Sequence, residues 1–140
     1  VAIVARGDAY GQSVGNTLAA VLQSAGLVPT VVDYNPRRVQ VTGTAAEDAA
    51  LQPDVSILVT YEEGANLLSA LVSAGLDPAT MIGLDAFFAP RIAELATATT
   101  EATAVDGFQM LGTMGTRAFL QRLYDDDPNG QVANAPQAYD

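Results

Sequence analysis

Hydrophobic and polar positions alternate along this chain in two recurring patterns. The first pattern is a short run of apolar, often β-branched residues, which is typical of a buried strand in a parallel sheet. Such runs cover residues 1–5, 28–34, 55–60, 81–84 and 107–111. Pro29 stands near the start of the second run. It favours an edge position for that strand, because proline has no N–H to donate to a neighbouring strand.

The second pattern places apolar residues at helical spacing between these runs. It predicts helices over residues 12–25, 42–52, 62–74, 87–96 and 116–124. Within the second of these helices, Glu47 and Asp48 are expected to face solvent. Residues 6–11 are polar and contain two glycines, so they predict a loop between the first strand and the first helix.

Strands that alternate with helices predict βαβ units and a parallel sheet. The fold class expected is therefore α/β: a doubly wound, flavodoxin-like three-layer sandwich around a mainly parallel five-stranded sheet. The chain has 140 residues, of which 49% are hydrophobic, enough for the core of a single domain. In such sheets ligands bind beyond the carboxyl ends of the strands, at the point where the strand order reverses.

Composition narrows the possible functions. The net charge is −10 and every one of the six basic residues is arginine, so no basic face is expected that could bind nucleic acid. Cysteine and histidine are both absent, which removes thiol chemistry, histidine bases and the commonest transition-metal ligands. No apolar run approaches the roughly 20 residues of a membrane span. We expect no catalytic residues, no metal and no cofactor.

Three other classes that share this kind of fold fit poorly. A signalling receiver domain needs an aspartate after the third strand and a lysine after the fifth, whereas Thr60 and Tyr61 follow the third strand and the chain has no lysine. A nucleotide or flavin enzyme would carry a glycine-rich loop after the first strand, and the required spacing is missing. A hydrolase needs an activated nucleophile, and neither Ser13 nor Ser56 has an evident activating partner.

The predicted strand ends carry the residues that suit a ligand. A carboxylate beside aromatic rings forms a pocket for a ligand that has an amine and an apolar side chain. The candidate ligand-binding residues are Tyr10, Tyr61, Glu62, Asp85 and Phe87.

Several residues near these ends also have ordinary structural explanations. Asp8 is as well suited to capping the first helix as to binding a ligand. Glu62 and Glu63 would lie in the first turn of a helix, where acids interact favourably with the helix dipole. Tyr34 is expected to pack at the sheet edge, and Phe87 and its neighbour would often belong to the core.

Several segments, taken in order, resemble the second lobe of the type I periplasmic solute-binding proteins. The resemblance is to the branched-chain amino-acid (Leu/Ile/Val) binding family of ABC transporters. It is carried by VAIVARGDAYGQSVG, PDVSILVTYEEGANLLSALVSAGL, MIGLDAFFAP, VDGFQML and PQAYD. The resemblance implies that Tyr10 faces the cleft between two lobes and that Tyr61 contacts the ligand. It implies that Asp85 holds the ligand's α-ammonium, with Asp in place of the longer Glu, and that Glu62 adds charge.

The resemblance also implies a function. Residues 1–140 would form a single α/β lobe, a fragment of a larger two-lobed protein, and would bind amino acids or similar small solutes for delivery to an ABC permease in the membrane. The other partner would be the missing first lobe, and the fragment would be able to pair with itself through the uncovered cleft. The location implied is the cell envelope, in the periplasm or lipid-anchored at the outer face of the membrane. The alternative is a ligand-sensing lobe of a receptor or transcription regulator with the same fold.

Overall fold

A parallel sheet forms the centre of the computed structural model, which describes residues 1–37, 41–84 and 109–110. The strands among these residues are β1 (Ala2–Arg6), β2 (Thr30–Tyr34), β3 (Ser56–Val59), β4 (Met81–Gly83) and β5 (Gln109–Met110). They are hydrogen-bonded in the order β2-β1-β3-β4-β5, and each neighbouring pair is parallel. This is the flavodoxin-like strand order, with its reversal point between β1 and β3.

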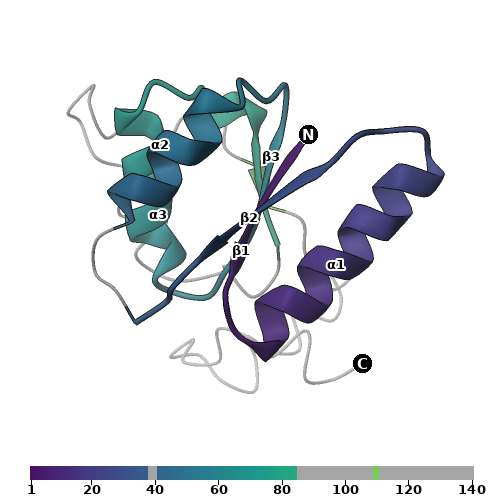
Figure 1. The fold of residues 1–140 in the computed structure, drawn as a ribbon. Helices are drawn as coiled ribbons and strands as arrows, with labels where there is room; N and C mark the ends of the chain where they lie inside the picture. The colour runs from purple at the N-terminus through teal and green to yellow at the C-terminus, as the bar shows by residue number, and fades with distance from the viewer. Residues whose placement is uncertain (38–40, 85–108, 111–140) are drawn as a thin grey trace, which may run out of the picture.

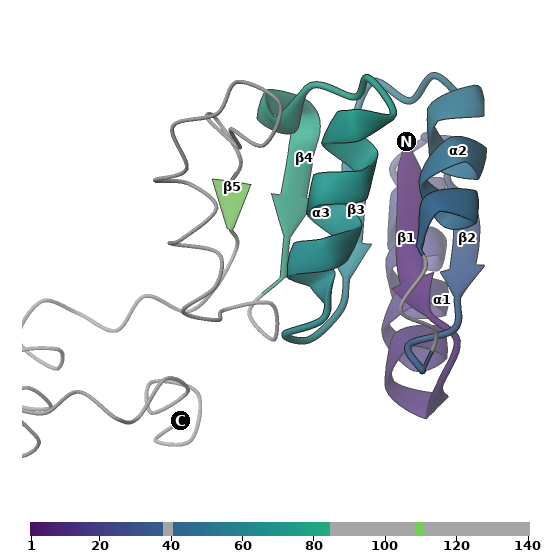
Figure 2. The ribbon, with the colours of Figure 1, turned by 90° about the vertical axis from the view of Figure 1, so that its left-hand side faces the viewer.

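Helices cover both faces of this sheet (Figure 1). The helix α1 (Ala9–Ser24) lies on one face, and α2 (Thr42–Ala50) and α3 (Gly64–Ser73) lie side by side on the other (Figure 2). A short 3₁₀ helix, η1 (Pro78–Thr80), precedes β4. The α/β fold class with a doubly wound parallel sheet is therefore confirmed.

Several boundaries differ from the sequence prediction by one to three residues, and one edge is confirmed. The helix α1 begins at Ala9 rather than at residue 12, so the loop predicted over residues 6–11 is too long. The strand β2 begins at Thr30, directly after Pro29, and it lies at the edge of the sheet as the proline predicted. The helices predicted over residues 87–96 and 116–124 lie outside the described residues.

The core has two apolar layers, one on each face of the sheet. Along β1, Val4 faces α2 and α3, whereas Ile3 and Ala5 face α1, as the alternation of side chains along a strand requires. The layer toward α2 and α3 is fully buried and includes Leu58, Leu67, Leu68, Leu71 and Met81. These layers hold the carboxyl ends of β1 and β3 next to each other.

Asp48 was expected to be exposed, and this prediction is wrong. The side chain is fully buried on the inner face of α2, where one carboxylate oxygen accepts a hydrogen bond from Ser56 Oγ at 2.8 Å. Among the described residues, the other oxygen, Oδ1, has no hydrogen-bond partner. Burial raises the pKa of Asp48, while the hydrogen bond from Ser56 opposes that shift. Ser56 thus has a carboxylate partner that sequence analysis missed, but both side chains lie inside the core.

Candidate functional site

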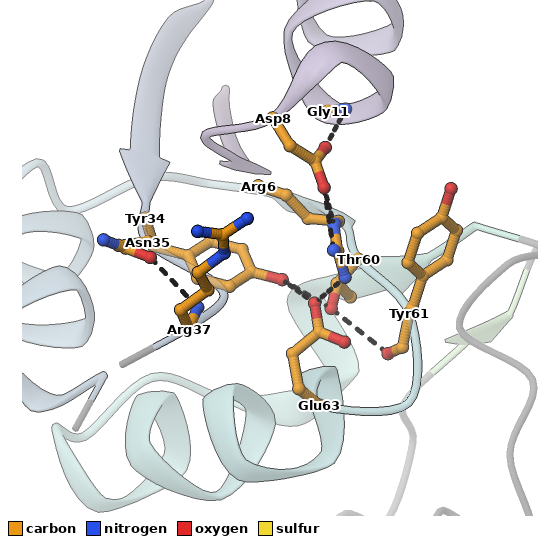
Figure 3. Close-up of polar contacts among 9 residues, drawn as sticks. All are labelled: Arg6, Asp8, Gly11, Tyr34, Asn35, Arg37, Thr60, Tyr61 and Glu63. Atoms are coloured by element: carbon orange, nitrogen blue, oxygen red, sulfur yellow. Dashed lines mark hydrogen bonds and ion pairs between the residues drawn. The ribbon is translucent and has the colours of Figure 1, made fainter. Parts of the chain in front are cut away.

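The candidate site lies where the chain leaves β1 and β3, at the point where the strand order reverses. The two strands are neighbours in the sheet and run in parallel, so the loops that follow them start from the same edge. The first loop leads from Arg6 into α1, and the second leads from Thr60 to the start of α3. Figure 3 shows that side chains from both loops converge at this edge.

Arg6 occupies the centre of this arrangement. Its Nε and Nη2 atoms lie 2.8 and 2.7 Å from Asp8 Oδ2, and its Nη1 atom forms an ion pair with Glu63 Oε1. Only 13% of the Arg6 side chain is exposed, so the guanidinium is held between two carboxylates and largely screened from solvent. Charge-assisted hydrogen bonds of this kind are stronger than neutral ones. Arg6 therefore joins the loop after β1 to the loop after β3.

Tyr34 extends the network to β2. Its hydroxyl lies 2.7 Å from Thr60 Oγ1 and 2.9 Å from Glu63 Oε1. A carboxylate can only accept, so the phenol proton is directed at Glu63. Burial raises the pKa of Tyr34 well above its usual value, and the hydrogen bond to Glu63 acts in the same direction. Tyr34 stays neutral and packs at the sheet edge, as expected, with a polar tie to the loop after β3.

Asp8 caps α1 and also pairs with Arg6. One oxygen, Oδ1, accepts the backbone N–H of Gly11 at 3.0 Å, and the other faces the guanidinium. Of the two roles that the sequence left open, capping is therefore confirmed. The hydrogen bond from Arg6 and that from the Gly11 N–H lower the pKa of Asp8.

We expect Asp8→Ala to lower the free energy of unfolding near pH 7 by about 1 kcal/mol, the usual cost of losing a cap. Since the pKa of Asp8 is lower in the folded state than in the unfolded chain, its stabilising contribution is present above the ordinary aspartate pKa and is lost as the pH falls through the folded-state value. Denaturant titrations near pH 7 and near pH 2 test this. A difference between the variant and the wild type that is equal at both pH values would contradict it.

Two tyrosines stack on each other, one from the first turn of α1 and one from the loop after β3. The ring centroids of Tyr10 and Tyr61 are 4.7 Å apart with an interplanar angle of 21°. The guanidinium carbon of Arg6 lies 4.2 Å from the centroid of the Tyr61 ring. Of the Tyr61 residue, 37% remains exposed. Tyr10 and Tyr61 thus form an aromatic surface at the carboxyl ends of β1 and β3, next to the ion pairs of Arg6.

The structure brings some predicted site residues together and leaves others untested. Tyr10 and Tyr61 are in contact, and Glu62 is exposed directly after Tyr61. Asp85 and Phe87 lie outside the described residues. Arg6 had no role in the sequence prediction, and its partner Glu63 was assigned only to the first turn of a helix. A single arginine directly after a buried strand, in a chain so poor in basic residues, was the available signal.

An open depression adjoins the network on the side of β2. It has a volume of about 490 Å³ and is lined by Gly7, Asp8, Gln12, Asp33, Tyr34, Asn35, Pro36 and Arg37.

Within the described part of the chain, no group of three or more acidic, histidine or cysteine side chains could hold a metal ion. The helices of this same part lack the combination of length and apolar character that crossing a membrane requires.

Comparison with known proteins adds a single finding. No family model and no curated protein matches the chain. A solved structure described as an ABC transporter permease from the Pseudomonas fluorescens group shares the fold, with a TM-score of 0.64 and 13% sequence identity. The match covers 95% of this chain and 33% of the other, so this chain spans about a third of that protein's length. At this identity the likeness establishes the fold, and the description belongs to the other protein.

Proposed function

We propose that this chain is the ligand-binding lobe of an extracytoplasmic solute-binding protein that delivers amino acids or similar small solutes to an ABC transporter. The observation that carries the proposal is the stacked pair Tyr10–Tyr61, partly exposed where the strand order reverses. In doubly wound sheets this is the place where ligands bind. Binding sites for small molecules also combine apolar and aromatic surface with a few polar groups.

The charges around the aromatic pair suit a ligand with a positively charged group. Asp8, Glu62 and Glu63 follow the same two strands as the rings, and Arg6 balances only one of these three negative charges. A ligand ammonium would pair with these carboxylates, and the tyrosine edges would cover an apolar side chain. An amino acid combines both features.

A site built from one lobe is half of a site. In the proposed mechanism a second lobe closes over the first, buries the solute, and the closed form docks on a permease. A sensor lobe of a receptor or transcription regulator would use the same half-site. The transport role is favoured by the description of the solved neighbour, which names an ABC transporter.

The proposal is tested by NMR titration of the 140-residue chain with each of the common amino acids. With only half of the site present, we expect a dissociation constant of about 1–10 mM, which corresponds to roughly 3–4 kcal/mol of binding free energy. Backbone amide shifts should change in the loops after β1 and β3 and little elsewhere. Shifts that are absent for every probe, or that are confined to other surfaces, would overturn the proposal.

Two variants sharpen this titration. Tyr61→Ala should remove most of the response, because it deletes the ring on which Tyr10 stacks. Asn16→Ala changes an exposed residue on α1 and should leave the response unaltered. A response that survives Tyr61→Ala at full size would separate the bound solute from the aromatic pair.

A further inference from the structure

We propose that Arg6 is the positioning residue of this site: it fixes the Tyr61 ring and locks the two loops together, so that the binding surface is formed before a ligand arrives. The inference rests on the proposed function, which supplies the role of the surface. It concerns a residue that makes no contact with the ligand itself. Three observations carry it, namely the partners of the guanidinium, its position over the Tyr61 ring, and the connection to β2.

The first observation is that the guanidinium has little capacity left for a ligand. Nε and Nη2 are engaged by Asp8 and Nη1 by Glu63, and the side chain is 13% exposed. An arginine at the carboxyl end of a strand is commonly the group that grips a ligand carboxylate with two parallel hydrogen bonds. Here two carboxylates of the protein itself, those of Asp8 and Glu63, contact the guanidinium nitrogens. Arg6 therefore acts within the protein rather than on a solute anion.

The second observation is that two groups of the protein contact the Tyr61 ring. The Arg6 guanidinium carbon and the Tyr10 ring lie 4.2 and 4.7 Å from the same ring centroid. The Tyr10 ring is stacked on Tyr61 with an interplanar angle of 21°. A cation over an aromatic face is attracted to it, so Arg6 stabilises this orientation. The ring is therefore held by two contacts within the protein while 37% of Tyr61 stays exposed.

The third observation is that the network ties three strands together. Arg6 ends β1, Glu63 precedes α3 after β3, and the Glu63 carboxylate also accepts the hydroxyl proton of Tyr34 from β2. Movement of the loop after β3 would break two interactions of Glu63 at once, the ion pair with Arg6 and the hydrogen bond from Tyr34. The conformational entropy of these loops is therefore lost when the chain folds, so ligand binding carries no further cost for ordering them.

The test is Arg6→Lys, which keeps the positive charge and the aliphatic stem but loses the planar fork. The chain is produced with isotope-labelled tyrosine rings, and the Tyr61 ring is observed by NMR without ligand. We expect the contacts of Tyr61 with Tyr10 to weaken and its ring resonances to move toward the values of an exposed tyrosine. Methyl resonances of the buried Leu67, Leu68 and Leu71 should stay in place and show that the fold is retained.

The second readout is the amino-acid titration repeated on the variant. Release of Tyr61 should raise the dissociation constant by about tenfold, which equals about 1.4 kcal/mol. If Tyr61 keeps its position in Arg6→Lys, the inference is overturned. If Tyr61 keeps its position and binding is still lost, Arg6 contacts the solute directly and the inference is equally overturned. If Arg6→Lys releases Tyr61 but the wild type binds none of the amino acids, the positioning role of Arg6 stands and the proposed function is wrong.

Discussion

Replacing Gly11 with alanine is expected to lower the free energy of unfolding by about 3 kcal/mol, the upper end of the range for an overpacked site. Gly11 is buried in the first turn of α1, where the helix sits directly on the end of β1. A Cβ atom added there would lie 2.0 Å from the carbonyl oxygen of Arg6 and 2.7 Å from the carbonyl carbon and nitrogen of the same residue. These are backbone atoms, so a rotamer change cannot relieve the overlap.

A matched control is available in α2. Gly43→Ala adds the same methyl group at an exposed helical position where nothing lies within 4 Å, and it should raise the free energy of unfolding by about 0.5–1 kcal/mol. Both variants are measured by denaturant titration against the wild type. If Gly11→Ala proves as stable as the wild type, the close contact between α1 and the Arg6 carbonyl is not present in solution.

The strands and helices of the described sheet were predictable because each element carries its own signal. Apolar runs predicted strands at β1 to β4, and Pro29 predicted the edge position of β2. The start of α1 was missed because the residues before it read as a polar loop with two glycines. Asp8 caps the helix, so it begins at Ala9, and Tyr10 packs against the core one turn before Val14.

The aromatic part of the site was predictable for the same reason. Tyr10 and Tyr61 follow β1 and β3, and parallel neighbours bring their carboxyl ends to one edge. The charged part was not predictable in this way. The pair of Arg6 with Glu63 depends on how each loop turns and on which rotamer each side chain adopts, and periodicity carries neither. A pattern identifies where polar groups gather, whereas their pairing is a property of the folded geometry.

The misassignment of Asp48 has a similar cause. A charged residue in a short, weakly amphipathic helix is normally exposed, because burying a carboxylate costs free energy. The rule fails here because α2 packs against the sheet through small residues such as Ala45, and the helix comes close enough for Asp48 to reach Ser56. Small side chains thus brought a polar group into the core, where it retains one hydrogen bond.

We therefore expect Asp48→Asn to raise the free energy of unfolding near pH 7 by about 1 kcal/mol, because removing the buried charge outweighs the cost of leaving the new amide N–H groups without an acceptor. Asparagine keeps an oxygen that can accept the Ser56 hydrogen bond, and it removes the charge from the site where Oδ1 has no partner among the described residues. Glu47→Gln is the matched control, since it makes the same change at an exposed position one residue away, and it should alter stability by less than about 0.5 kcal/mol.

The pH dependence distinguishes this explanation from a simple packing effect. Burial raises the pKa of Asp48 above its value in the unfolded chain, so the folded state holds the proton more tightly. The contribution of Asp48 to the stability of the wild type should fall as the pH rises from the ordinary aspartate pKa through the raised folded-state value, and should be restored on acidification. The advantage of Asp48→Asn should accordingly be largest near pH 7 and disappear near pH 3. A variant that is less stable than the wild type throughout this range would mean that the buried carboxylate is fully partnered in solution.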